Sequence, residues 1–269
     1  MRGIGLLIFA AILAQAQSSK QTPGNQMEML KEVGFDQKLN TQLPLHLPFR
    51  DHTGKDITLG ALFSDKPVVL VPVYYECPML CNLSMSGLVK SLKVLSLQAG
   101  VDYRVVMFSI DPKETPTLAA EKRKAYMKQY HRPGTEDGWQ FLVGDETSVR
   151  ELTGALGFRY VYDQTIKQYA HAAGVVVATP TGRLARYLYG IDYAPKDLKL
   201  GIVEAADGRI SDPVSQLLLL CFHYDPSLGK YTMSVMNLVR VAGIATLLAM
   251  GLFVAASLRK DRNEESTHG

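Results

Sequence analysis

A near-continuous apolar run is the feature that most constrains the fold of this chain. Val68–Tyr75 reads Val-Val-Leu-Val-Pro-Val-Tyr-Tyr, without the alternation that marks a strand with one solvated face. Such a run is typical of a central strand that is buried on both faces of its sheet. Two cysteines, Cys77 and Cys81, follow it directly, and a helical spacing of leucines and valines then continues from Leu83 to a stop at Gly100. We expect a buried strand, a cysteine-bearing turn and a helix.

The rest of the central region alternates between strand-like and helix-like stretches. In chain order, the predicted elements are short strands at Leu43–Phe49 and Ile57–Leu59, a strand at Tyr103–Ile110, a helix at Thr117–Tyr130, a strand at Gln140–Val143, a helix at Glu146–Leu156, a hairpin of Ala172–Ala178 and Leu184–Tyr189, and a helix between Pro195 and Gly208. Strands that alternate with helices indicate an α/β fold with a mixed sheet flanked by helices. This order predicts a thioredoxin-like domain.

The N-terminus has the pattern of a secretory signal peptide. Arg2 precedes an apolar run, Ile4–Leu13, that is too short to span a bilayer, and Ala14-Gln15-Ala16 is a small-x-small cleavage pattern. The alternative is a buried N-terminal helix, which the polar residues Ser18–Lys20 disfavour. We therefore expect the body of the protein to be exported.

The C-terminal region predicts a single membrane span. Val241–Leu258 holds no charged residue, and eighteen helical residues reach about 27 Å, close to the thickness of the hydrocarbon core. Arg240 precedes the run and three basic residues within Arg259–Arg262 follow it, which places the tail in the cytoplasm. A buried soluble helix is the alternative. The expected location is the inner (cytoplasmic) membrane, with the domain facing the periplasm or the cell exterior.

These patterns divide the chain into one folded domain with appended segments. The predicted divisions are 1–16 as signal peptide, 17–36 as polar N-terminal arm, 37–210 as thioredoxin-like domain, 211–235 as juxtamembrane segment, 236–258 as transmembrane helix and 259–269 as cytoplasmic tail. The net charge of +3 is too mild to indicate a nucleic-acid partner.

Cys77 and Cys81 are candidate metal ligands. Residues four apart lie on one helical face, so both sulfur atoms can point to a common spot. A helix N-terminus also stabilises thiolates, and two thiolates suit Cu(I) or zinc far better than magnesium or calcium. The alternatives are a structural disulfide or two inert buried thiols. The chain has three cysteines, so pairing two of them would leave one thiol free.

Several separated motifs resemble the Sco/SenC family. They are Tyr75–Cys81, Phe108–Pro116, Leu142–Gly144 and a histidine stretch that ends in Thr181–Arg183, within a similarity that extends from about Leu43 to Gly208. The family consists of thioredoxin-like proteins implicated in copper delivery to cytochrome c oxidase. The resemblance implies that this chain shares their fold and that function.

The resemblance also implies a ligand set and partners. Cys77, Cys81 and His171 would bind one copper ion, as Cu(I) or Cu(II). The implied partners are the copper-A subunit of the oxidase and a periplasmic thiol reductant or copper donor. The alternative function is a thiol–disulfide oxidoreductase that acts on exported cysteines through the redox-active pair. The Cys-x-x-x-Cys spacing and the His171-Ala172 position, where thioredoxin enzymes have a cis-proline, favour a metallochaperone over an enzyme.

Two positions depart from the family motif. The family has an aspartate after Cys-Pro and a proline after the second cysteine, and here those places hold Met79 and Asn82. Without that carboxylate, metal affinity and redox poise are expected to differ from those of typical members. Met79 offers a thioether ligand or, alternatively, a packing or partner surface.

For Asp111 the sequence allows two interpretations, and for three histidines it predicts no functional role. Asp111 either caps a turn before Pro112 or contributes to the electrostatics of the site. His46, His52 and His131 are expected on the surface, without a role in the site.

Cys221 and His223 form a Cys-x-His pair shortly before the predicted membrane span. The pair is either a second soft-metal site that would suit copper transfer near the membrane, or a thiol and an imidazole in an apolar packing segment.

Overall fold

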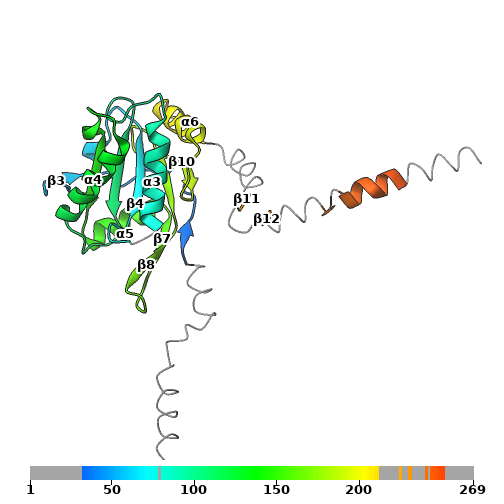
Figure 1. Ribbon diagram of the computed structural model, residues 1–269, viewed down its shortest axis with the longest axis horizontal. Helices are drawn as coiled ribbons and strands as arrows, with labels where there is room; N and C mark the ends of the chain where they lie inside the picture. The colour runs from blue at the N-terminus through cyan, green and yellow to red at the C-terminus, as the bar shows by residue number, and fades with distance from the viewer. Residues whose placement is uncertain are drawn as a thin grey trace, which may run out of the picture. The chain divides into compact units, whose positions relative to one another are not determined.

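The computed structural model describes residues 32–77, 80–211, 224–225, 230–231, 240–241 and 243–251. The largest sheet has seven strands, with helices packed on both of its faces (Figure 1). The strands are β1 (Gly34–Phe35), β2 (Pro48–Asp51), β3 (Asp56–Thr58), β4 (Val68–Val73), β5 (Arg104–Ser109), β6 (Trp139–Val143), β7 (Phe158–Asp163), β8 (Gln168–His171), β9 (Gly174–Ala178) and β10 (Leu184–Tyr189). The helices are α3 (Leu80–Lys93), α4 (Pro116–Tyr130), α5 (Glu146–Ala155) and α6 (Pro195–Ala206), with 3-10 turns η1 (Leu59–Leu62) and η2 (Glu136–Gly138).

The large sheet is mixed, as the sequence predicts. Its strand order is β10-β9-β4-β5-β6-β2-β3. The central strands β4, β5 and β6 are parallel to one another, and β9, β10, β2 and β3 pair antiparallel with their neighbours. Helices α3 and α4 make the two crossovers between the parallel strands, which gives the predicted α/β order of a thioredoxin-like fold.

Strand β4 is buried on both faces, which confirms the prediction from its apolar run. Successive side chains of a strand point to opposite faces. Val69 and Val71 therefore pack in the cluster that α3, α4 and α6 share. Val68 and Leu70 pack in the second cluster, with α5 and the segment that precedes β2. All four side chains are at most 1% exposed, so the sheet separates two cores.

One hairpin was not predicted. Strands β7 and β8 pair antiparallel, with Tyr160 opposite His171, and β1 extends this small sheet along β7. The turn between the two strands contains neither Gly nor Pro; instead Lys167 adopts the left-handed conformation, with φ of 52°. The usual turn signal was therefore missing from the sequence, and His171 ends a strand that had not been expected.

Helix boundaries differ from the predictions mainly at one place. The helix expected to reach Gly100 ends at Lys93, and Leu95 continues as a turn whose side chain remains buried. Helix α4 begins one residue earlier than predicted, at Pro116, with the Thr115 hydroxyl accepting a hydrogen bond from a backbone N–H as its N-cap.

The chain divides into two compact units, residues 1–211 and 212–269. In the second unit the structure describes only the short pair β11 (Tyr224–Asp225) and β12 (Lys230–Tyr231) and helical residues at 240–241 and 243–251. Among the described residues, no helix has the length and the apolar character that crossing a bilayer requires. The predicted signal peptide, most of the polar arm, Met79, Cys221 and His223 lie outside the described residues.

Candidate metal centre

The carboxyl end of β4 carries the two cysteines. After Val73 the chain turns, and the Cys77 N–H donates to the carbonyl oxygen of Tyr74 at 3.0 Å. The described part of α3 starts at Leu80, which puts Cys81 in its first turn. The order of strand, turn and helix is the one that the sequence predicts. Both sulfur atoms therefore lie where a parallel sheet opens at the carboxyl ends of its strands.

Strand pairing brings His171 to the same place. Strand β9 runs antiparallel to β4, with Val176 opposite Leu70, so the residues that lead into β9 arrive at the carboxyl end of β4. His171 is three residues before Gly174, the first residue of β9. Ninety residues separate it from Cys81 in the sequence, and only the sheet order joins them.

The three candidate ligands converge in a buried cluster. One donor atom each of Cys77, Cys81 and His171 lies within 4.8 Å of the other two, and all three residues are at most 9% exposed. His171 Nε2 is 3.2 Å from Cys81 Sγ. His171 Nδ1 lies 2.9 Å from the carbonyl oxygen of Ala172. A carbonyl oxygen only accepts, so Nδ1 carries the proton and the lone pair of Nε2 faces the sulfur atoms.

The charge state of the thiols depends on their neighbours. The hydrogen bond from Cys81 to Cys77 raises the pKa of Cys81 above its usual range, and burial raises it further. The backbone N–H of Tyr74, which donates to Cys81 Sγ at 3.3 Å, has the opposite effect on this pKa. Binding of a cation by Cys81 must therefore release the proton of its thiol group, which couples metal binding to pH.

A buried carboxylate supports the turn that carries Cys77. Glu114 Oε2 accepts from the Tyr75 N–H at 3.0 Å, and Oε1 accepts from the Glu76 N–H at 2.7 Å. The Ser109 hydroxyl donates to Oε2 at 2.5 Å, while its oxygen accepts from the Asp111 N–H at 3.0 Å. Glu114 is 6% exposed, and burial raises the pKa of its carboxyl group. The sequence gives no sign of this role of Glu114, because no local pattern signals a contact over 38 residues.

Asp111 forms the turn that one of its two interpretations predicts. Its Oδ1 accepts from the Lys113 N–H at 2.9 Å, an Asx-turn, and it is not one of the three clustered ligands. Its charge still acts near the site. Burial raises the pKa of Tyr169 to about 12, and the Asp111 carboxylate adds to that rise. The ring of Tyr169 is in edge contact with that of Tyr74, at 5.5 Å between centroids.

The other described histidines lie away from the cluster. His46 and His131 are exposed, as predicted; His46 Nε2 is 3.7 Å from Glu151 and His131 ends α4. His52 differs from the prediction because it is only partly exposed, and its Nδ1 is buried without a hydrogen-bond partner. Burial and the charge of Arg123 lower the pKa of His52.

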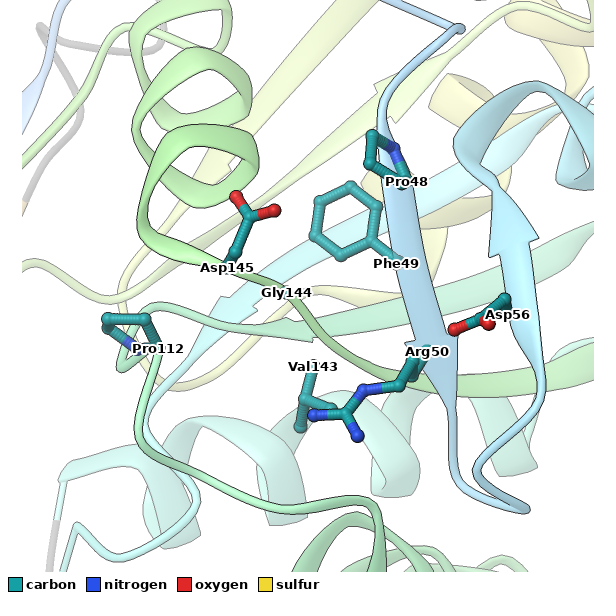
Figure 2. Close-up of a pocket in the computed structure, with 8 residues that line it drawn as sticks. All are labelled: Pro48, Phe49, Arg50, Asp56, Pro112, Val143, Gly144 and Asp145. Carbon is teal, nitrogen blue, oxygen red and sulfur yellow. The ribbon is translucent and has the colours of Figure 1, made fainter.

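A separate hollow of about 270 Å³ lies at the carboxyl end of β6 (Figure 2). Arg50 and Asp56 line one side of it, and Asp145, which caps α5, lines the other. A methyl group at Gly144 would lie 2.6 Å from the Phe49 ring, so glycine is required for this close approach. The lining contains no cysteine or histidine, and the hollow therefore lacks the soft ligands of the metal centre.

Comparisons with known proteins show the family and the fold. A family model described as SCO1/SenC matches residues 38–203. A candidate electron transfer protein from Aquifex aeolicus VF5 has 26% identity and a TM-score of 0.56, and the match covers 64% of this chain and 96% of that one. A candidate electron transport protein from the same organism has 26% identity, a TM-score of 0.52 and coverages of 64% and 100%. A SCO1/SenC family lipoprotein from Bacillus anthracis has 18% identity, a TM-score of 0.51 and coverages of 64% and 99%. A search of curated proteins gives no match.

The fold and the cluster of two thiols and one imidazole define a thioredoxin-like protein with a potential soft-metal site. Because the family model spans more than half of the chain, the chain belongs to the SCO1/SenC family.

Proposed function

We propose that this protein binds one copper ion through Cys77, Cys81 and His171. In this proposal it delivers the ion to, or prepares the thiols of, the copper-A centre of cytochrome c oxidase. The convergence of the three ligand atoms within 4.8 Å is the observation that carries the proposal. Two sulfur ligands and a neutral imidazole suit Cu(I) and can also accept Cu(II). Membership of the SCO1/SenC family supports copper as the metal and the oxidase as the target.

The surroundings of the three ligands favour reversible binding, in which the metal ion is taken up and later released. Cys77 follows the fully buried strand β4, Cys81 lies in the first turn of α3 and His171 ends β8, so the fold holds their backbone positions without a metal. The His171 tautomer already presents Nε2. The Cys81 thiol group, however, must lose its proton before it binds a cation, so proton uptake can accompany release of the metal.

The second candidate function is a thiol–disulfide oxidoreductase. The proximity of Cys77 and Cys81 favours it, since a disulfide can form between neighbouring sulfur atoms. The two functions differ in their dependence on His171, which a metallochaperone needs as a ligand and an oxidoreductase does not.

The test is the Cu(I) affinity of the reduced protein, measured by competition with a chromophoric chelator. His171→Ala should weaken Cu(I) binding at least tenfold and leave oxidation of the two cysteines by a disulfide unchanged. His131→Ala removes an exposed imidazole and serves as the matched control. Equal affinity of His171→Ala and the wild-type protein would refute the three-ligand site.

Export and membrane attachment are part of the proposal. The apolar run Val241–Leu258 and the basic residues after it support a C-terminal anchor, and Ile244, Leu247 and Leu248 are more than half exposed. The full-length chain should stay in the membrane fraction after alkaline carbonate extraction, whereas a chain that stops at residue 235 should become soluble. Release of both proteins would contradict a membrane span.

We further propose that Cys221 and His223 form a second copper site. Copper stoichiometry decides between this and a packing role. Two equivalents that fall to one in Cys221→Ala/His223→Ala would support the site, and one equivalent in both proteins would exclude it.

A further inference from the structure

The side chain of Asn82 forms a hydrogen bond with the backbone of Cys77, five residues earlier in the chain. Asn82 follows Cys81 in the first turn of α3, and its side chain reaches back to Cys77. Asn82 Nδ2 is 3.2 Å from the carbonyl oxygen of Cys77. Because a carbonyl oxygen only accepts, the amide group must present its NH₂ to Cys77 and its oxygen to the opposite side.

Tyr126 holds that amide group in place. Its hydroxyl group, on α4, donates to Asn82 Oδ1 at 3.1 Å. The Tyr126 side chain is 8% exposed, and its ring stacks on Phe141 with 6.3 Å between centroids. Burial and the nearby thiols raise the pKa of Tyr126 to about 12, so the hydroxyl group keeps its proton at neutral pH. The orientation of the Asn82 amide is therefore fixed by a helix other than its own.

The backbone of Cys77 is consequently held at both of its polar groups. Its N–H donates to Tyr74 and its C=O accepts from Asn82. A residue whose backbone is fixed on both sides loses less conformational freedom when its side chain binds a ligand. Neither Asn82 nor Tyr126 belongs to the ligand cluster, so they affect binding only by positioning its members, and the hydrogen bond of Asn82 goes to Cys77.

We propose that Asn82 is a positioning residue, which with Tyr126 holds Cys77 in the ligand-binding position of the metal-free protein. This rests on the proposed function, because the position matters only if the sulfur atom binds copper or reacts with Cys81. A hydrogen bond contributes a net 0.5–1.5 kcal/mol, which corresponds to a change in binding of about two- to tenfold.

The test compares three variants of the full-length chain in detergent. Asn82→Leu keeps the branched shape of the side chain, is somewhat larger and cannot form either hydrogen bond. Tyr126→Phe removes only the hydroxyl group. Ser86→Ala is the matched control, because Ser86 Oγ makes another contact between α3 and α4, at 3.4 Å from Gln129 Oε1. The measurements are Cu(I) affinity, the thiolate-to-Cu(II) charge-transfer absorption and the free energy of unfolding.

Asn82→Leu should weaken Cu(I) binding about two- to tenfold and shift the charge-transfer band. Tyr126→Phe should have a smaller effect in the same direction. The double variant should bind no more weakly than Asn82→Leu, because both changes act through one contact. Ser86→Ala should bind as the wild-type protein does. A variant Asn82→Leu with lower stability but unchanged affinity and absorption would show a merely structural role and overturn the proposal.

A metal-free measurement separates this proposal from the proposed function. Equilibration with glutathione oxidises Cys77 and Cys81 to a disulfide, while one oxidised glutathione is reduced to two thiols. Asn82→Leu should lower the formation constant of the disulfide about two- to tenfold, a rise in reduction potential of about 9–30 mV. If the wild-type protein binds no copper but this shift occurs, the proposed function fails and the positioning role stands. If the formation constant is unchanged as well, the positioning role fails.

Discussion

At the scale of single residues, buried polar contacts hold the turn that carries Cys77. The Glu114 carboxylate accepts three hydrogen bonds, two of them from the backbone N–H groups of Tyr75 and Glu76. A buried N–H without an acceptor is costly, so the turn depends on both carboxylate oxygens. The geometry of the site is therefore set partly by a side chain that does not belong to the ligand cluster.

Glu114→Gln is expected to lower the free energy of unfolding by about 1–3 kcal/mol at neutral pH. The amide group of glutamine has only one acceptor oxygen, so either the Tyr75 or the Glu76 N–H would face an NH₂ group. Chemical denaturation measures the change. Glu121→Gln, the same substitution at an exposed position of α4, should change stability by less than about 0.5 kcal/mol. Equal stability of the two variants would contradict the supporting role of Glu114.

The raised pKa of Glu114 predicts a pH dependence of stability. Burial favours the protonated form in the folded protein, whereas in the unfolded chain the carboxyl group titrates near its ordinary value of 4.5. Between 4.5 and the raised pKa, the folded protein binds more protons than the unfolded chain. The contribution of Glu114 to the free energy of unfolding therefore falls as pH rises through that window.

Denaturation at a series of pH values above 4.5 checks this sign. The slope of stability against pH in the window should be more positive in Glu114→Gln than in the wild-type protein. Parallel profiles would show that the Glu114 carboxyl group does not titrate differently in the two states.

At the scale of elements, the small sheet of β1, β7 and β8 carries His171 to the metal centre. Its first strand approaches the turn between α5 and β7 closely, since the Asp36 N–H donates to the carbonyl oxygen of Gly157 at 2.7 Å. Gly157 has φ of 64°, and a methyl group on it would lie 1.9 Å from the Asp36 oxygen. Glycine is required there both by conformation and by space.

Gly157→Ala should destabilise the protein by about 2 kcal/mol or more, because the backbone of β1 must shift and the left-handed conformation is strained. Gly154→Ala is the matched control, and it should stabilise the protein rather than destabilise it. A methyl group at Gly154 meets nothing within 4 Å, and alanine is the better helix former at the end of α5, by up to about 1 kcal/mol. Thermal denaturation compares the two. Similar effects of both substitutions would contradict the close approach.

At the scale of the whole molecule, the metal centre joins parts of the chain that the sheet brings together. Cys77 lies on the connection between β4 and α3, Cys81 lies in the first turn of α3, and His171 lies at the end of β8, three residues before β9. A ligand that binds all three residues stabilises only the conformation in which these elements are assembled. Metal binding should consequently report on the folded state of residues 32–211 as a whole.

Copper is therefore expected to stabilise the protein against unfolding. At a free Cu(I) concentration one hundred times the Kd, the free energy of unfolding rises by about 2.7 kcal/mol if the unfolded chain does not bind Cu(I). Denaturation with and without buffered Cu(I) measures it, and a Cu(I) chelator should reverse it. His171→Ala should show a much smaller gain at the same Cu(I) concentration. An equal gain in both proteins would indicate binding by the cysteines alone.

The sequence by itself determined the features that depend on neighbours along the chain. The apolar run of β4 predicted burial on both faces, and the spacing of Cys77 and Cys81 predicted sulfur atoms on one side of a turn and helix, because these patterns repeat within one strand or one helical turn. The resemblance to the Sco/SenC family supplied His171 as a candidate ligand.

Only the tertiary structure decided which distant groups meet. The contacts of His171 with Cys81, of Glu114 with Glu76 and of Tyr126 with Asn82 span 90, 38 and 44 residues. No periodicity along the chain records them, because they depend on strand order, on the β7–β8 hairpin without a glycine turn, and on the packing of α4 against α3. The ligand types could be predicted from the sequence. Their convergence, and the hydrogen bonds that hold the Cys77 backbone, arise from the pairing of the strands and the packing of the helices.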